Sequence, residues 1–202
     1  MSSGCKKDEP QITNPDITTS NSAFLPFTVG NYWYYDLYKV IDSTGMEESL
    51  NYADTAKVIA EEMINGNTYF VIEQDSWLSQ DNRKDTLYYR DSSGYIVNVD
   101  GDILFSSVDF NNILHTIDYD PTPWVVEYSV SDAFENHSVP SGDFDCLNFK
   151  GRFFSTDPND NRPDRFIDNC YSENVGIVLQ SIFYASQFDV RYERRLSDFH
   201  LE

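Results

Sequence analysis

Apolar and polar residues alternate along the chain from Phe24 onward, and this period of two is typical of β-strands. Residues 31–40 carry the signal most clearly, because Trp33, Tyr35 and Leu37 fall on one face of an extended segment rich in aromatic residues. A strand of this kind buries one face and turns the other toward solvent. The pattern therefore predicts a half-buried β-strand over residues 31–40.

Four further segments carry a strand signal. Residues 124–130 and 147–153 alternate apolar and polar positions, which predicts two more half-buried strands. Residues 175–183 and 189–199 are long apolar and aromatic runs separated by a short polar stretch. Two such runs with a short connection predict a hairpin at the end of the chain.

Turn residues between apolar runs predict the earlier hairpins. Asn65-Gly66 is the strongest of these signals, because Asn and Gly adopt positive φ at low cost, as a two-residue hairpin turn requires. The tripeptide 92–94 is predicted to connect a strand over 86–90 to a strand over 95–99, and residues 100–102 predict the next turn.

The order of these elements predicts the fold class. Residues 107–117 match a helical stripe poorly, so we expect at most one short helix there. No alternation of strands and helices is present, which excludes a parallel sheet. About nine or ten antiparallel strands must hide their edges by closing into a barrel, stacking as a sandwich or curling around an insert. We therefore expect an all-β domain over residues 24–202, built as a single antiparallel curled sheet, half-barrel or sandwich-like.

Composition and charge narrow the function classes. The 202 residues are 40% hydrophobic, 15% aromatic and 24% charged, which suits one domain with a packed core and excludes a disordered or fibrous chain. No run of 18 apolar residues occurs, so no membrane-spanning helix is predicted. With 34 acidic and 14 basic residues, the net charge of −20 makes binding to nucleic acid unfavourable.

The first residues resemble the processing site of a bacterial lipoprotein. Cys5 follows the small residues Ser3 and Gly4 and precedes the polar stretch 6–9, although Ser2 stands where that family usually has Leu. The resemblance implies cleavage before Cys5, acylation of its thiol and anchoring in the outer membrane, as in lipoproteins of the Bacteroidetes type. We expect the numbering to begin inside a longer leader.

Residues 6–23 are dominated by Asn, Thr, Ser, Pro and Asp, which bury too little apolar area to offset the entropy of ordering. We therefore interpret residues 1–23 as the end of a signal sequence followed by a flexible tether. Such a tether would hold the globular domain off the bilayer, with the protein either exposed at the cell surface or facing the periplasm.

Two segments of the body also resemble known proteins. Residues 27–35 are similar to the first strand of many secreted lipoproteins of the same bacterial group, and residues 171–178 and 191–201 are similar to their closing strands. The resemblance covers about a quarter of the chain, and it implies a curled antiparallel half-barrel like that of the lipoprotein carriers. It concerns fold more than activity.

Cys146 and Cys170 are the two cysteines that remain once Cys5 is assigned to the lipid. Disulfides persist in exported proteins, and a bond between these two would close a loop worth roughly 3 kcal/mol. We therefore predict a Cys146–Cys170 disulfide, with two free thiols as the alternative.

The segment between them contains oxygen side chains at the spacing of a calcium loop, namely Asp157, Asn159, Asn161 and Asp168. Arg162 stands where that loop needs Gly, and the same residue types are ordinary in long hairpin loops. Calcium is the one cofactor that the sequence suggests, with a solvated loop as the alternative.

Catalytic chemistry is sparse in this sequence. Its three histidines lack metal-ligand spacing, and no serine nucleophile elbow, phosphate loop or dinucleotide fingerprint occurs.

Aromatic residues are abundant, and most of them are expected in the core. Trp77 is our candidate for an exposed aromatic residue that could serve as a ligand platform.

The sequence therefore favours a non-enzymatic envelope lipoprotein that binds a glycan, a lipid or a protein. An acyl-chain carrier needs an apolar cavity on the concave side of the sheet. A surface carbohydrate hydrolase needs a cleft with facing carboxylates beside a Trp.

Overall fold

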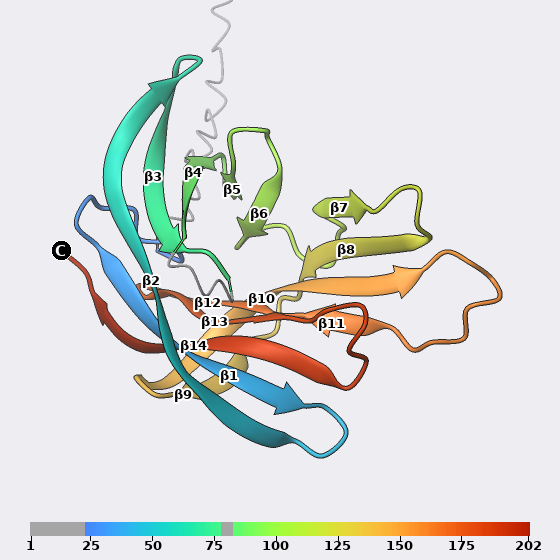
Figure 1. Ribbon diagram of the computed structural model, residues 1–202. Helices are drawn as coiled ribbons and strands as arrows, with labels where there is room; N and C mark the ends of the chain where they lie inside the picture. The colour runs from blue at the N-terminus through green and yellow to red at the C-terminus, as the bar shows by residue number, and fades with distance from the viewer. Residues whose placement is uncertain (1–22, 78–82) are drawn as a thin grey trace, which may run out of the picture.

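The computed structural model describes residues 23–77 and 83–202, which form fourteen β-strands and no helix (Figure 1). The strands are β1 (Tyr32–Ile41), β2 (Met46–Ile64), β3 (Asn67–Asp75), β4 (Lys84–Ser92), β5 (Tyr95–Val97), β6 (Ile103–Ser106), β7 (His115–Asp118), β8 (Trp124–Val130), β9 (Glu135–Val139), β10 (Gly142–Ser155), β11 (Arg165–Ile167), β12 (Asn169–Ser172), β13 (Gly176–Ile182) and β14 (Val190–His200).

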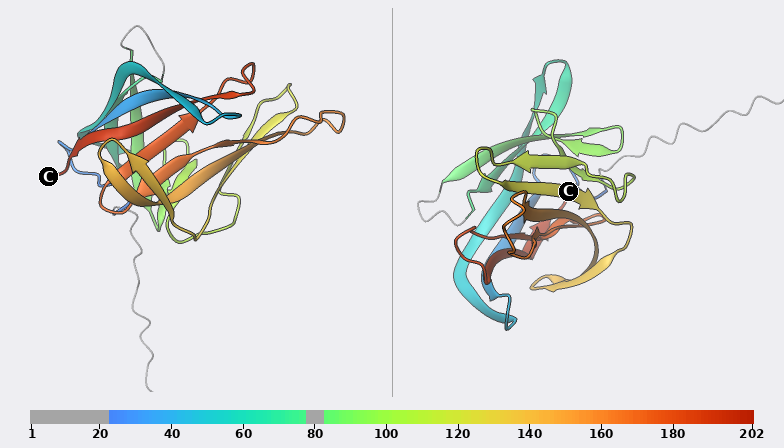
Figure 2. Two further views of the ribbon diagram at one scale, coloured as in Figure 1. Left: turned by 90° about the horizontal axis from the view of Figure 1, so that it is seen from below. Right: turned by 90° about the vertical axis from the view of Figure 1, so that its right-hand side faces the viewer.

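All pairings join these strands into one antiparallel sheet, which confirms the predicted fold class. The order is β6-β5-β4-β3-β2-β1-β14-β13-β12-β10-β8-β7, with β9 and β11 each paired to β10. The sheet curls until its two edge strands, β6 and β7, approach each other, as Figure 1 and the views of Figure 2 show. The result is a nearly closed barrel whose concave side faces inward.

The long strand β2 helps to produce this curl. Its first part pairs with β1 and its second part with β3, so it belongs to two differently directed regions of the sheet. Asn51 has a φ of +52°, and the register shifts between Val58 and Ala60. Irregularities of this kind bend a strand and increase its twist.

The local turn predictions are confirmed. Asn65 and Gly66 have φ values of +50° and +81° and connect β2 to β3, as a hairpin turn with two positive φ values requires. Ser93 and Gly94, at +53° and +89°, connect β4 to β5 in the same way. The predicted final hairpin is β13 paired with β14.

One sequence prediction is wrong. The expected nine or ten strands are too few, because short pairings such as β5, β6 and β11 carry almost no periodic signal over three or four residues. Residues 107–117 form no helix, in agreement with the expectation of at most one short helix there. This segment ends within the edge strand β7, whose His115 pairs with Tyr128 of β8.

Two clusters of buried side chains hold the sheet together. One centres on Trp33, Tyr35 and Leu196, and the other on Phe105 and Phe149. Phe24 and Leu25 are buried in the second cluster, so the chain enters the core almost at the first described residue. Across residues 23–77 and 83–202, no helix has the length and apolarity needed to cross a bilayer.

Candidate functional site

The concave side of the sheet encloses a cavity of about 270 Å³. Its walls come from both halves of the curled sheet, because strands distant in the sequence face each other across it. Most of the lining is apolar, and it includes Leu25, Trp33, Val58, Ile72, Tyr171 and Ile177. Apolar cavities with a few converging polar groups are the usual form of a small-molecule site.

Gly151 on β10 packs under Tyr128, whose ring lines the cavity. The ring of Tyr128 lies across Gly151, and a Cβ at that glycine would stand only 2.6 Å from Tyr128 Cε1. Tyr128 also stacks on Phe149, with ring centroids 5.0 Å apart. The absence of a side chain at Gly151 therefore lets a flat aromatic surface face the cavity.

A belt of hydrogen-bonded polar side chains crosses the cavity wall over four strands. Arg194 on β14 donates from Nε to Gln180 Oε1 at 2.9 Å and from Nη2 to Gln74 Oε1 at 3.0 Å. Gln180 donates in turn to Asn169 Oδ1, and Asn169 donates to the carbonyl of Phe149. The cavity is therefore amphiphilic, with apolar walls and one polar side.

Arg194 lies between two aromatic rings. Its guanidinium carbon is 5.0 Å from the ring centroid of Tyr35 and 4.8 Å from that of Trp77. Trp77, which was predicted to be exposed, is half-buried against Arg194 and lines the cavity. Stacking between planar rings fixes the guanidinium plane while leaving its edge available for hydrogen bonds.

Asp54 on β2 is the acidic neighbour of Arg194. Both side chains are almost fully buried, with 2% of Arg194 and 0% of Asp54 exposed. Arg194 Nη1 and Asp54 Oδ2 are 3.6 Å apart, which is ion-pair distance but too long for a good hydrogen bond. Within the described residues, neither oxygen of Asp54 nor Nη1 of Arg194 has a hydrogen-bond partner.

The surroundings of Asp54 disfavour its charge. Burial raises the pKa of Asp54 to about 6, against the opposing effect of Arg194, and the charge of Asp75 raises it further. Asp75 on β3 is better satisfied, because Thr55 donates to it from its backbone nitrogen and its hydroxyl and Lys84 lies 2.7 Å away. The negative charge of Asp75 is therefore stabilised by hydrogen bonds and by Lys84, whereas burial disfavours the negative charge of Asp54.

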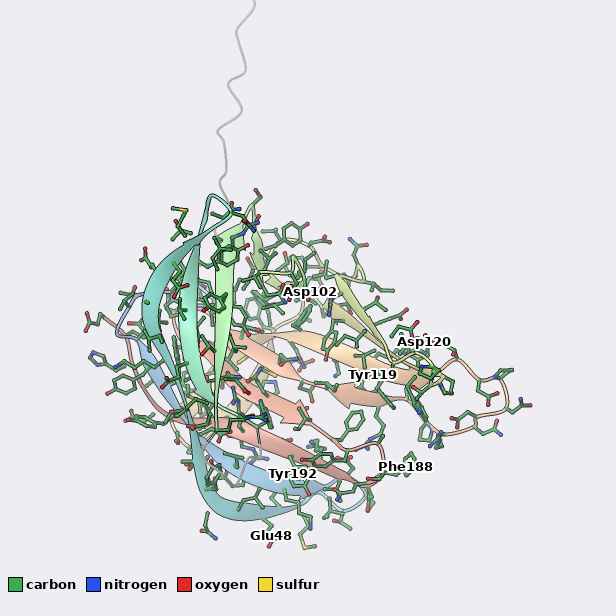
Figure 3. The ribbon with its side chains drawn as sticks, turned by 45° about the horizontal axis from the view of Figure 1, so that its top comes forward. Glu48, Asp102, Tyr119, Asp120, Phe188 and Tyr192 are labelled. Atoms are coloured by element: carbon green, nitrogen blue, oxygen red, sulfur yellow. The ribbon has the colours of Figure 1, made fainter. Side chains whose placement is uncertain are left out.

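The edge strands meet beside this cavity without pairing to each other. His115 of β7, which lines the cavity, lies with Nδ1 3.6 Å from Asp102 Oδ1, just before β6. Figure 3 labels Asp102 just before β6, together with Tyr119 just after β7 and Tyr192 on β14. Between the edge strands β6 and β7, the contact of His115 with Asp102 therefore takes the place of backbone hydrogen bonds.

The predicted disulfide is not formed. Cys146 and Cys170 are free and buried. In the register of β10 and β12, Cys146 lies opposite Ser172 and Cys170 lies opposite Asn148, so the two thiols occupy diagonal positions. Diagonal neighbours stand roughly 7–8 Å apart, whereas a disulfide needs Cβ atoms about 3.5–4.5 Å apart. Cys170 Sγ instead lies 3.4 Å from His137 Nε2.

The four residues of the predicted calcium loop do not converge. Asp157 accepts hydrogen bonds from Asn159, while Asp168 lies between β11 and β12 and accepts one from Asn148 at 2.9 Å. Asn161 precedes Arg162, whose side chain pairs with Asp160. In the described part of the chain, no group of three or more His, Cys, Asp or Glu side chains is arranged to hold a metal ion.

Sequence reasoning missed the most informative side chain, Arg194. Alternation along residues 189–199 placed it on a strand, but its inward direction depends on the pairing with Gln180 across β13. Residues 189–199 contain Arg191, Arg194 and Arg195, and no local pattern distinguishes the buried one from the other two. The predicted lipidation site, Cys5, lies outside the described residues.

Comparison with known proteins finds two solved structures that are similar to this chain. No known family matches the sequence, and no curated protein matches it. An inferred exported protein with a YmcC-like fold from Bacteroides fragilis is similar with a TM-score of 0.47 and 14% identity, over 86% of this chain and 97% of that one. An inferred lipoprotein from Parabacteroides distasonis has the same TM-score and identity, over 88% of this chain and 98% of that one.

Proposed function

We propose that this protein is a non-enzymatic binding protein that takes one small, largely apolar molecule into the cavity of its curled sheet. The observation that carries the proposal is the cavity itself, which is apolar over most of its wall and polar along one belt. An apolar ligand gains free energy by leaving water, and the belt would fix its orientation.

The size of the cavity limits the ligand. Its volume of about 270 Å³ lies at the small end of ligand sites, which typically measure about 300–1,000 Å³. A single short acyl chain or a small aromatic molecule fits this space, whereas several long chains do not. Of the functions predicted from the sequence, acyl-chain binding is therefore favoured in the form of one short chain.

Hydrolysis of carbohydrate is less well supported. That reaction needs two carboxylates facing each other across a cleft, about 5 to 9 Å apart. Trp33 and Trp77 line the cavity, but none of its described lining residues is Asp or Glu. The aromatic residues are present without the acid and base that the chemistry requires.

Titration with octan-1-ol, followed by tryptophan fluorescence, tests the proposal because Trp33 and Trp77 both line the cavity. Ala56→Leu extends a buried cavity-lining position on β2, and we expect it to weaken binding while the protein stays folded. Ala53→Leu makes the same change at an exposed position of the same strand and should leave binding unchanged. Absence of saturable binding by the unaltered protein would reject the proposal.

We also propose that an acyl anchor on Cys5 holds this domain at the bacterial envelope, in the outer membrane. Support comes from the order of small residues, cysteine and polar tether at positions 3–23. Mass spectrometry of protein purified from its native cells should find acyl chains on Cys5. An unmodified thiol at Cys5 would contradict the anchor and leave the binding proposal intact.

A further inference from the structure

We propose that the ligand is an uncharged amphiphile, such as a short-chain alcohol, ester or amide, whose polar head hydrogen-bonds to the free tyrosine hydroxyls of the cavity wall, those of Tyr89 and Tyr128. This inference rests on the proposed function and names the chemical class that the same cavity would take. It follows from which polar groups of the wall can meet a ligand and from the charge that those groups carry.

Four tyrosines from four different strands are among the described lining residues, and two of them have free hydroxyls. Tyr35 on β1 and Tyr171 on β12 donate to backbone carbonyls, at 3.1 Å and 3.4 Å. Among residues 23–77 and 83–202, the hydroxyls of Tyr89 on β4 and Tyr128 on β8 have no hydrogen-bond partner. Each of these two hydroxyls can donate one hydrogen bond and accept another.

These two hydroxyls face space that a ligand can enter. Among the described side chains, the fully buried polar atoms without a partner belong to Asp54 and Arg194 alone. Tyr89 and Tyr128 are half-buried and line the cavity, so their unpaired oxygens are accessible from it. A polar ligand atom that reaches them exchanges a hydrogen bond with water for one with the protein.

The tyrosine hydroxyls remain neutral at neutral pH. Burial raises the pKa of Tyr89 to about 12, although the nearby charge of Arg194 acts in the opposite direction. Burial is also the largest cause that raises the pKa of Tyr128 to about 12. Both phenols therefore keep their protons and can donate them in hydrogen bonds to an uncharged acceptor.

The cavity offers no counter-charge to an ionic ligand. Arg194 is the one Lys or Arg among the described lining residues, and none of them is Asp or Glu. Its Nη1 is fully buried beside Asp54, and its Nε and Nη2 groups already donate to glutamine side chains. An ion that enters such a cavity loses its hydration without compensation, whereas a neutral head group loses much less.

The first test compares octan-1-ol, octanoate and octylammonium, which share the hydrocarbon chain and differ in the charge of the head group. Binding is measured at neutral pH in about 0.5 M salt, which screens the net charge of −20 on the protein. We expect octan-1-ol to bind at least about tenfold more tightly than either ion. Equal or tighter binding of either ion would overturn the inference and leave the proposed function intact, whereas failure of all three to bind would reject the proposed function.

The second test removes the two hydroxyls and keeps the rings. We expect the double variant Tyr89→Phe/Tyr128→Phe to bind octan-1-ol at least about fivefold more weakly, because a hydrogen bond to the head group is lost. Tyr88→Phe is the control, because it removes a hydroxyl from the adjacent position of β4, which is not among the described lining residues. Unchanged affinity of the double variant would overturn the assignment of the head group to these tyrosines. Should the double variant fail to fold, the two single variants give the same comparison.

Discussion

Asp54 is a carboxyl group whose ionisation the fold disfavours. Burial is the largest cause that raises the pKa of Asp54 from 3.8 to about 6, so the folded protein holds this proton more tightly than the unfolded chain does. The associated stability is fully present below about pH 4 and is lost as the pH rises through about 6. Asp54 therefore destabilises the folded state at neutral pH.

We predict that Asp54→Asn matches the stability of the unaltered protein near pH 4 and exceeds it by up to about 3 kcal/mol above pH 6. Urea unfolding at several pH values measures this difference. Asp75→Asn is the control with the opposite sign, because hydrogen bonds from Lys84 and Thr55 outweigh burial and lower the pKa of Asp75. Its penalty should be largest at neutral pH and shrink in acid. A pH-independent effect of Asp54→Asn would contradict the account.

Gly151 permits the close approach of Tyr128, and this gives a second prediction at the residue scale. A Cβ 2.6 Å from Tyr128 Cε1 forces the ring to move, so Gly151→Ala should destabilise the protein by about 1–3 kcal/mol. In the Tyr128→Ala background the same substitution should cost much less, because its clash partner is gone. Thermal unfolding of the four proteins measures the coupling, and additive effects would show that the ring does not constrain this position.

At the scale of elements, the pairing of β10 with β12 places Cys146 and Cys170 at diagonal positions, where they remain free thiols. Burial raises the pKa of Cys146 to about 12 and raises the pKa of Cys170 as well, so both thiols are protonated and unreactive in the folded protein. We predict slow reaction with a thiol reagent in the native state and full reaction of both in denaturant without reductant. Failure of both to react in denaturant would indicate the disulfide that the structure lacks.

The same scale shows where sequence patterns inform and where they do not. Asn65-Gly66 predicts its hairpin correctly because positive φ is a local property of those two residues. The relation of Cys146 to Cys170 depends on a register between distant strands, and one step of register changes which residues face each other. The contact of Trp77 with Arg194 depends on the curl of the whole sheet, which no local pattern specifies.

At the scale of the molecule, one continuous sheet both builds the core and leaves a space within it. Its edges, β6 and β7, come together through side chains such as His115 and Asp102, without a backbone ladder. The cavity therefore arises from sheet curvature and from the sizes of inward side chains. Neither property is encoded by a short motif, which is why the sequence left the presence of a pocket open.

A crystal structure of the protein with 8-bromooctan-1-ol tests the central claim most directly, because bromine can be located by its anomalous scattering. Bromine is expected inside the cavity, at its apolar end near Val58 and Ile72. An empty cavity at saturating ligand, or bromine bound only on the outer face of the sheet, would contradict it.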